Sequence, residues 1–310
     1  MNQPRTELKG SALIIGHPYI DIELVVDEIP HGDEKVLASE GVVSFGGNAV
    51  TAAFCCSKLG FVPDLLSTSA TDWFGRMFAD MVEKYNLYWH QRHVRTFSYS
   101  AIFPNNGKRA MVRRRDEDYL HGFPLLNIEG CRIVHSDGLQ NDAVLHYFRE
   151  ARRFNVPTSL DGGSLRENMN EILKLTDIAI VSLRLCEQMS LTPGKMLSRL
   201  RHSGCKVGGV TLGEHGMLWY ESEGADRRLP ALSVPPEKVI DATGAGDIFH
   251  GAYVYSFLTW PERSWEEHFK FARAAAAYAV QHLGNEASLP TVAEVEQIAA
   301  TFKERIAAAA

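Results

Sequence analysis

The sequence predicts an α/β protein with a doubly wound, mostly parallel central sheet flanked by helices, together with a small β-sheet lid. Short apolar runs alternate with longer amphipathic segments over most of the chain, which is typical of repeated β-α units. The last third carries only helical patterns. Two segments that alternate polar and apolar residues, 17–45 and about 91–115, lack crossover helices and predict the small sheet.

Six apolar runs are the expected strands of the central sheet, because each is short and bounded by turn residues. They are residues 12–16, 64–68, 131–137, 156–162, 177–182 and 205–213. The segments between them carry apolar residues at helical spacing, and the expected crossover helices are residues 48–59, 73–87, 141–154, 165–174 and 193–203. This order indicates a parallel sheet that is covered on both faces.

The C-terminal third is expected to form three helices, at residues 244–260, 264–283 and 291–308. The last of these follows Pro290 and Thr291, and Glu294 stands where a capping-box partner is needed. No repeat or low-complexity tract divides the chain. We therefore expect a single domain over residues 1–310, with residues 17–45 and about 91–115 closing over the site as a lid.

The composition is that of a globular protein of a reducing compartment. The net charge is −6, and the chain has no basic surface of the kind that nucleic-acid binding requires. No apolar run approaches the roughly 20 residues that cross a bilayer. The five cysteines form no Cys-x-x-Cys pair and no zinc spacing. We expect a cytoplasmic protein with neither nucleic acid nor membrane as a partner.

Residues 239–253, VIDATGAGDIFHGAY, place small residues and an acid directly before an apolar helical run. A helix N-terminus presents unpaired N–H groups and a partial positive charge. The small residues Gly244, Ala245 and Gly246 would let a phosphate approach that backbone, with Asp247 at its edge. Phosphoryl transfer needs little more than such a positive pole and a base for an alcohol. A plain helix cap after a glycine turn is the structural alternative.

A second stretch, SFGGNAVTAAFCCSKLG at residues 44–60, joins an extended segment to an amphipathic helix. Gly46 and Gly47 leave the backbone open to a ligand, and Asn48 can donate to and accept from hydroxyl groups. An ordinary helix start is the alternative. The chain carries no Gly-x-x-x-x-Gly-Lys-Ser/Thr loop, no His-Glu-x-x-His and no Gly-x-Ser-x-Gly, so its motifs give no support to a hydrolase.

Together, the two stretches resemble the sequence signatures of the ribokinase-like (PfkB) carbohydrate kinases. Residues 44–60 resemble the family's Gly-Gly helix, and DATGAGDIFHGAY is similar to its Asp-Thr-x-Gly-Ala-Gly-Asp-x-Phe-x-Gly-Ala motif. GHPYID, SLDGG, VTLGEHG and LGNEASLPT follow in the family's order. The resemblance spans the chain and implies transfer of the ATP γ-phosphoryl group to an alcohol, usually a hydroxymethyl group of a small sugar.

The resemblance also implies a role for each matching residue. Asp247 would be the catalytic base, and the backbone N–H groups of Gly244, Ala245 and Gly246 would form the anion hole. The acceptor pocket would be lined by Asp21, Gly46, Gly47 and Asn48. The nucleotide would lie along Thr211, Gly213 and Gly216, and a monovalent cation such as K⁺ could be held by Asp241 and Thr243.

Three positions depart from the family pattern. Thr51 stands where the family often has Asn, and Ala242 stands where it has Thr. In the Asn-x-x-Glu motif, which helps to organise the water around Mg²⁺, Glu187 is kept but Arg184 replaces Asn. Arg184 could instead approach the nucleotide phosphates. The replacement of Asn by Arg184 therefore affects the expected Mg²⁺ site, and the expected base, Asp247, is unchanged.

The choice of acceptor is expected to depend on the lid, where Lys35 and Arg113 would contact the substrate. Basic residues that face the pocket would favour an acidic or phosphorylated sugar. Strand alternation lets only some of the arginines at 113–115 point inward, and outward-facing arginines are the alternative.

Two other functions fit the same fold. A nucleoside kinase would need an aromatic base pocket near the lid, for which Phe97, Tyr99 and Phe103 are candidates. A sugar-binding sensor would keep the fold and lose turnover, but it has no need of a base such as Asp247. The exposed lid sheet could also pair two copies into a homodimer.

Overall fold

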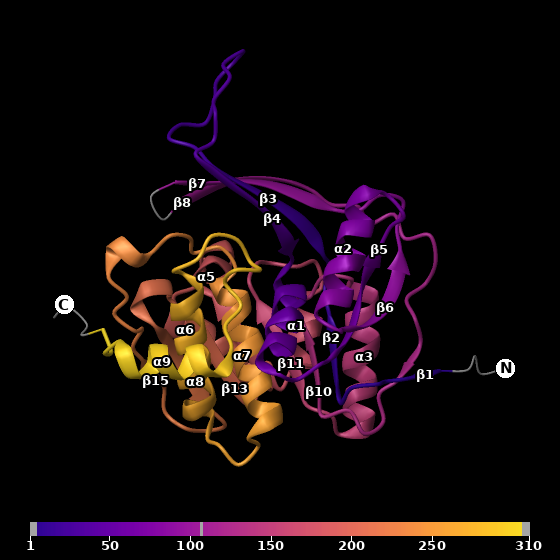
Figure 1. Cartoon of the computed structure of the whole chain (residues 1–310). Helices are drawn as coiled ribbons and strands as arrows, with labels where there is room; N and C mark the ends of the chain where they lie inside the picture. The colour runs from indigo at the N-terminus through magenta and orange to yellow at the C-terminus, as the bar shows by residue number, and fades with distance from the viewer. Residues whose placement is uncertain (1–4, 106–107, 306–310) are drawn as a thin grey trace.

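A nine-stranded sheet runs through the centre of the protein in the order β15-β14-β13-β12-β11-β10-β2-β5-β6 (Figure 1). The computed structural model describes residues 5–105 and 108–305. The strands from β13 to β6 run parallel, while β14 and β15 form an antiparallel edge. The strands are β2 (Ala12–Ile15), β5 (Asp64–Ser69), β6 (Tyr88–His93), β10 (Ile133–Ser136), β11 (Thr158–Gly162), β12 (Ile178–Ser182), β13 (Val207–Thr211), β14 (Met217–Glu221) and β15 (Arg227–Leu229).

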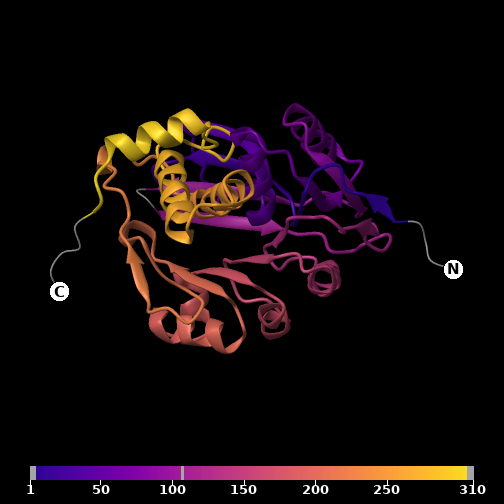
Figure 2. The same cartoon turned by 90° about the horizontal axis from the view of Figure 1, so that it is seen from below.

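Alternate residues of these strands feed two separate apolar cores, one on each face of the sheet. Figure 2 shows the two helical layers on opposite sides. One layer contains α1 (Asn48–Leu59), α2 (Trp73–Lys84), α7 (Ala245–Thr259), α8 (Trp265–Ala279) and α9 (Val292–Thr301). The other contains α3 (Asn141–Phe154), α4 (Met169–Lys174), α5 (Leu183–Gln188) and α6 (Pro193–His202).

A separate four-stranded sheet, in the order β4-β3-β7-β8, lies over one edge of the central sheet (Figure 1). Its strands are β3 (Tyr19–Val25), β4 (Glu40–Gly46), β7 (Tyr99–Asn105) and β8 (Lys108–Arg114). β3 pairs antiparallel with β4 and parallel with β7. We call this the small sheet. A short parallel pair, β1 (Thr6–Glu7) with β9 (Leu126–Asn127), and two 3₁₀ turns, η1 (Gly213–His215) and η2 (Pro236–Lys238), complete the described elements.

Helices α1 and α7 pack with almost no space between their backbones. A Cβ atom placed on Gly251 of α7 would lie only 2.6 Å from the carbonyl oxygen of Ala52 in α1. Two cysteine thiols of α1 donate to the backbone of α7, from Cys55 to the Ile248 oxygen at 3.7 Å and from Cys56 to the Gly251 oxygen at 3.1 Å. All five cysteines are buried and free, and such cysteines pack as small apolar residues.

The structure confirms the predicted fold class and adds elements that the apolar pattern does not show. β6 reads YWHQRH and β15 reads RRL, so neither edge strand carries an apolar run. Residues 91–93 consequently belong to the central sheet rather than to the small one. Helix α4 begins at Met169 instead of residue 165, because residues 163–168 form a loop that packs toward the site.

The last predicted helix is shorter than the sequence pattern indicates. α9 begins as expected with a capping box between Thr291 and Glu294, but it ends at Thr301. The chain then turns extended at Phe302, and Glu304 forms a β-bridge with Leu232. Residues 306–308 lie outside the described part. No helix within residues 5–105 and 108–305 is long and apolar enough to cross a membrane.

Gly251→Ala tests the contact between α1 and α7. The added methyl group would overlap the Ala52 backbone, so we expect the free energy of unfolding to fall by about 1–3 kcal/mol although alanine favours helices. Gly194→Ala is the control, because Gly194 is exposed in α6 and an added Cβ there meets nothing within 4 Å. Urea denaturation of both variants gives the comparison, and equal stability of Gly251→Ala and wild type would contradict this account.

Candidate active site

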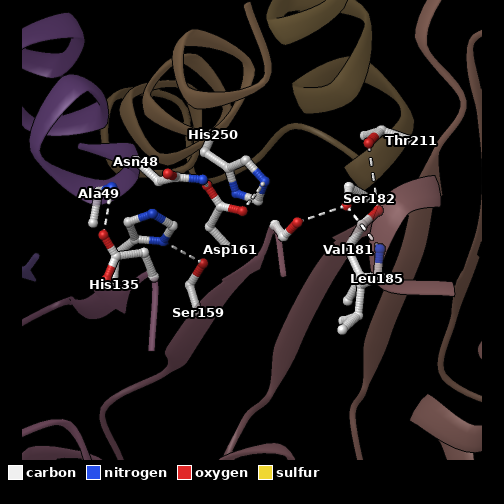
Figure 3. A network of polar contacts seen from close by, with 12 residues as sticks. Asn48, Ala49, His135, Ser159, Asp161, Val181, Ser182, Leu185, Thr211 and His250 are labelled. Atoms are coloured by element: carbon white, nitrogen blue, oxygen red, sulfur yellow. Dashed lines mark hydrogen bonds and ion pairs between the residues drawn. The ribbon is translucent and has the colours of Figure 1, made fainter. Parts of the chain in front are cut away.

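Two helix N-termini and the carboxyl ends of two parallel strands meet at one edge of the central sheet (Figure 3). The backbone N–H of Ala49, in the first turn of α1, donates to Asp137 Oδ2 at 3.2 Å, just after β10. The Asn48 side chain donates from Nδ2 to Oδ2 of Asp161, in β11, at 3.2 Å. In open α/β sheets this edge is where ligands bind.

The start of α7 has the geometry of an anion cradle. Gly244 is the N-cap and has a left-handed backbone with φ 73°. A Cβ atom at Gly244 would lie 2.0 Å from Asn285 Oδ1, so only glycine fits there. Gly246 is exposed, and a Cβ atom there would meet nothing within 4 Å. The first-turn N–H groups are therefore accessible to an anion, beside the half-buried Asp247.

One face of the small sheet is polar and is turned toward the start of α7. The strand register aligns Asp21 with Ser44 and with Ser100, and Ser100 with Arg113, so these four residues form a row across the sheet. Asn285, which follows α8, donates from Nδ2 to the Phe45 oxygen at 2.9 Å and to Asp21 Oδ2 at 3.4 Å. Asn285 therefore joins this polar face to the anion cradle.

Gly46 at the end of β4 and Gly47 directly after it leave space for groups next to the polar face of the small sheet. A Cβ atom on Gly46 would lie 2.0 Å from Asp21 Oδ2, and one on Gly47 would lie 2.2 Å from the His17 oxygen. Gly47 also has φ 104°, a conformation that favours glycine. A side chain at Gly46 would displace the carboxylate of the buried Asp21, and one at Gly47 would collide with the His17 backbone.

Arg113 is the arginine of residues 113–115 that joins the polar row. Its Nε donates to Ser100 Oγ at 2.9 Å, and its guanidinium lies 4.0 Å over the ring of Tyr19. Arg114 instead lies 3.8 Å from Asp116, and Arg115 pairs with Glu117 at 3.2 Å. A planar guanidinium held at Nε and over a ring keeps its two terminal nitrogens free to donate in a fixed plane.

Buried acids at the ends of β10 and β11 were not among the predicted site residues. Burial raises the pKa of Asp137, whose carboxylate accepts from the backbone of Leu139 at 2.9 Å as well as from Ala49. Burial also raises the pKa of Asp161 to about 6. His250 Nε2 lies 3.5 Å from Asp161 Oδ1, and burial lowers the pKa of His250 to about 3, so this contact joins a neutral imidazole to a carboxyl group.

The predicted nucleotide residues lie along the ends of β12 and β13. Thr211 ends β13 and donates from Oγ1 to the Val181 oxygen at 3.4 Å (Figure 3). Gly213 and Gly216 flank η1, both with positive φ, and a Cβ on Gly216 would lie 2.1 Å from the Leu229 oxygen. Arg184 and Glu187 are exposed on α5, three residues apart and therefore on one face of that helix.

The predicted cation residues present two buried oxygens without hydrogen-bond partners. Asp241 Oδ1 accepts from the Thr243 backbone N–H at 2.8 Å, which folds the two residues together. Within residues 5–105 and 108–305, Asp241 Oδ2 and Thr243 Oγ1 have no hydrogen-bond partner. A carboxylate and a hydroxyl oxygen are suitable donors for a hard monovalent cation. The described residues contain no group of three or more His, Cys, Asp or Glu side chains that could hold a metal.

Some predicted residues lie away from this edge. Lys35 is exposed in the loop between β3 and β4, which projects away from the body of the molecule (Figure 1). Phe97 is buried and packs on Phe78 of α2, and Tyr99 packs on Phe74 of the same helix. Phe103 lies two strand positions further along from Ala101, on the Tyr99 side of β7 and not on the side of Ser100. Phe97 therefore belongs to the core, while Tyr99 and Phe103 share the face of β7 opposite Ser100.

Sequence signals for the missed residues are present but weak by themselves. Asp137 and Asp161 each stand at the end of a predicted strand, where acids gather at one edge of a parallel sheet. Asn285 lies within LGNEASLPT, a stretch whose position in the family order carries no information about its contacts. Nothing in the spacing links residue 285 to residue 21 or 244, because those contacts arise only in the folded chain.

Comparisons with known proteins agree with this geometry. The sequence model described as "pfkB family carbohydrate kinase" matches residues 9–292. The chain is 23% identical over 304 residues to a ribokinase of Mus musculus, covering 92% of this chain and 93% of that protein. A putative ribokinase from Agrobacterium tumefaciens has a similar structure, with a TM-score of 0.85 at 21% identity and coverage of 96% and 98%. Arabidopsis thaliana ribokinase complexed with ribose and ATP gives a TM-score of 0.76 at 21% identity, with coverage of 94% and 98%.

The raised pKa of Asp161 predicts a pH-dependent difference between wild type and Asp161→Asn. Below about pH 4 the carboxyl group is protonated in both the folded and the unfolded chain. As pH rises to 7, the unfolded chain ionises first, so wild type loses stability that the neutral asparagine keeps. We expect the free energy of unfolding of Asp161→Asn, relative to wild type, to rise by up to about 3 kcal/mol between pH 4 and pH 7.

Urea denaturation at pH 4 and pH 7 measures this difference. Asp161→Ala is the consistency control, because it also lacks the titrating group and must show the same pH dependence whatever its stability. A constant difference between wild type and Asp161→Asn across this range would contradict the raised pKa.

Proposed function

The chain belongs to the pfkB family of carbohydrate kinases, phosphotransferases with an alcohol group as acceptor, and we propose that it transfers the γ-phosphoryl group of ATP to a hydroxyl of a small carbohydrate. The observation that carries this proposal is the start of α7. There, a glycine backbone open to anions stands beside Asp247, and Asn285 joins it to the polar face of the small sheet.

In this proposal Asp247 is the general base. It orients the acceptor hydroxyl and removes its proton as the new phosphate ester forms. The backbone N–H groups at Gly244, Ala245 and Gly246 stabilise the charge on the phosphoryl oxygens, aided by the positive end of α7. Ile248 and Phe249 are buried directly behind the acid, so water has little access from that side.

The acceptor would bind between the central sheet and the small sheet, which would serve as a lid. Asp21 and Asn48 offer hydrogen bonds to sugar hydroxyls, and Gly46 and Gly47 let the sugar approach the backbone. Arg113 would contact the acceptor from the lid. Lys35 would reach it only if the loop between β3 and β4 closes inward, because it is exposed in this conformation.

ATP would lie along Thr211, Gly213 and Gly216, with Arg184 near its phosphates. The related Arabidopsis ribokinase is described as complexed with ribose and ATP, which supports this choice of donor. Mg²⁺ normally binds through phosphates and water with one or two carboxylates, so the exposed Glu187 fits an indirect role. When bound, Mg²⁺ would neutralise phosphate charge, and Asp241 with Thr243 would hold a K⁺ ion near the cradle.

The alternatives receive less support. A nucleoside acceptor would need a stacking surface, and of the candidate rings Phe97 is buried and Tyr99 already packs on Phe74. A sensor without turnover has no need of an acid at the cradle.

We keep the homodimer as a proposal, because the outer face of the small sheet exposes 46% of Val43 and 71% of Val112 in one cross-strand row. Light scattering would measure the oligomeric state.

The deciding experiment is ADP release from Mg·ATP across free hexoses, pentoses, ketoses, sugar acids, sugar phosphates and nucleosides. Acceptor-dependent release with sugars is the expected result. Release with nucleosides alone would replace the proposed acceptor, and ATP binding without release across the whole panel would favour the sensor.

Asp247→Asn tests the general base. We expect kcat to fall about 10²–10⁴-fold with little change in acceptor affinity, because the base acts mainly in the transition state. Asp226→Asn is the control, since Asp226 lies in the turn between β14 and β15, at the opposite edge of the sheet from the site. A loss of less than about tenfold in Asp247→Asn would exclude the general-base role.

Arg113→Gln tests the contact between the lid and the acceptor. We expect a higher acceptor KM with an unchanged KM for ATP, and the size of the effect reports acceptor charge. A lost charge-assisted hydrogen bond to an anion raises KM about tenfold or more, and loss of a bond to a neutral hydroxyl raises it less. Arg114→Gln is the matched control, because Arg114 points toward Asp116. Equal kinetics for both variants would remove Arg113 from the acceptor site.

A further inference from the structure

A chain of polar contacts runs from Asn48 to buried side chains in the core beneath the site, and Figure 3 draws its members Asn48, Asp161, His250, Ser159 and His135. Its first link is the bond from Asn48 to Asp161, and its second is the contact of Asp161 with His250. The rest is buried: His250 Nδ1 lies 3.3 Å from the Tyr253 hydroxyl, Tyr253 lies 2.6 Å from Ser159 Oγ, and Ser159 lies 2.9 Å from His135 Nδ1. The chain crosses α1, β11, α7 and β10.

One assignment of protons lets each group of this chain donate toward its neighbour on the Asp161 side. The Tyr253 hydroxyl donates to His250 Nδ1, which leaves the proton of the neutral imidazole on Nε2, facing Asp161. Ser159 then donates to Tyr253, and His135 donates to Ser159. The carboxylate then accepts from Asn48 on Oδ2, while the His250 N–H faces Oδ1, with 3.5 Å between Nε2 and Oδ1.

Asp161 also determines which way the Asn48 carboxamide faces. The carboxylate accepts from Nδ2, whereas the amide oxygen would be repelled by it, so Oδ1 must face away from Asp161. Gly163 makes the space for this arrangement, because a Cβ atom there would lie 2.7 Å from Asn48 Nδ2. Asn48 is only partly buried, so its fixed carbonyl oxygen is available as an acceptor at the edge of the site.

The same carboxylate connects the two helices of the site. His250 lies three residues after Asp247 on α7, hence on the same side of that helix and one turn further along. Asn48 is the first residue of α1 and follows the two glycines of the acceptor pocket. Asp161 therefore contacts Asn48 of α1, which lies on the proposed acceptor side. It also contacts His250 of α7, the helix that carries the proposed general base.

We propose that Asp161 is a positioning residue for the sugar acceptor, acting through Asn48 in a slot that Gly163 keeps open. The proposal rests on the function proposed above. Asp161 does not touch the acceptor in this account. It holds the Asn48 carbonyl oxygen as an acceptor for a substrate hydroxyl and keeps it in register with the helix that carries Asp247.

A double-mutant cycle of Asp161→Ala and Asn48→Ala tests the proposal. In the wild-type background, Asp161→Ala should raise the acceptor KM about tenfold, with kcat and the KM for ATP changed by less than about twofold. In the Asn48→Ala background, the same change should alter the acceptor KM by less than about twofold. Additive effects, or an equal rise in the KM for ATP, would overturn the proposal.

Asp161→Asn and Gly163→Ala separate positioning from loss of stability. Asp161→Asn keeps a carbonyl oxygen that can accept from Asn48, so it should restore most of the acceptor affinity. Gly163→Ala leaves Asp161 in place but fills the slot, and it should raise the acceptor KM as Asp161→Ala does. Gly122→Ala is the control, because Gly122 is exposed and an added Cβ there meets nothing within 4 Å. No effect of Gly163→Ala on the acceptor KM would contradict the slot.

A crystal structure of Asp161→Ala gives a readout that needs no activity. We expect the Asn48 side chain to leave its position between residues 161 and 163, and an unmoved side chain would overturn the proposal. This outcome is separate from the ADP-release assay on wild type, whose failure across all sugars would instead remove the proposed function.

Discussion

The close approach of α1 and α7 is the constraint on which the site depends. Gly251 lets the two backbones touch at Ala52, and the thiol of Cys56 donates across the gap. The N-terminal parts of both helices consequently lie at one edge of the sheet, close enough for Asp161 to contact Asn48 at the start of α1 and His250 in the second turn of α7. Phosphoryl transfer requires acceptor and phosphate to be held within a fraction of an ångström of their reacting positions. A pair of helices without clearance between them meets that requirement better than a loop could.

A second constraint is the absence of side chains around the proposed acceptor and phosphate positions. Gly46 gives space to the Asp21 carboxylate, and Gly244 gives space to Asn285. Asn285 then binds Asp21 and the Phe45 backbone, so the small sheet is attached at its base to the start of α7. The loop between β3 and β4, at the far end of the small sheet, is exposed. An anchored base and an exposed end are the properties expected of a lid.

Much of the fold could be predicted from the sequence, because parallel strands and crossover helices carry periodic apolar patterns. Helix α1 matches its predicted bounds, and the capping boxes at Ser264 and Thr291 fix two helix starts. Edge strand β6 could not be predicted from apolar periodicity, because most of its side chains are only partly buried or exposed and need not be apolar. The cradle at α7 was recognisable because its residues are contiguous. Asp161, His250 and Asn285 were not, because their roles arise from contacts between distant segments.

Asp247 of α7 and Asp161 of β11 lie in opposite electrostatic environments, and this suits the different tasks that we propose for them. Asp247 lies in the first turn of α7, where the helix dipole favours a carboxylate, which suits its proposed role as a base. Asp161 is buried, and its charge costs stability, as its raised pKa shows. An apolar residue at 161 would remove the acceptor for Asn48 and leave its carboxamide free to turn. In our proposal, the buried hydrogen-bond acceptor at 161 serves orientation at the reacting edge, at some expense to folding.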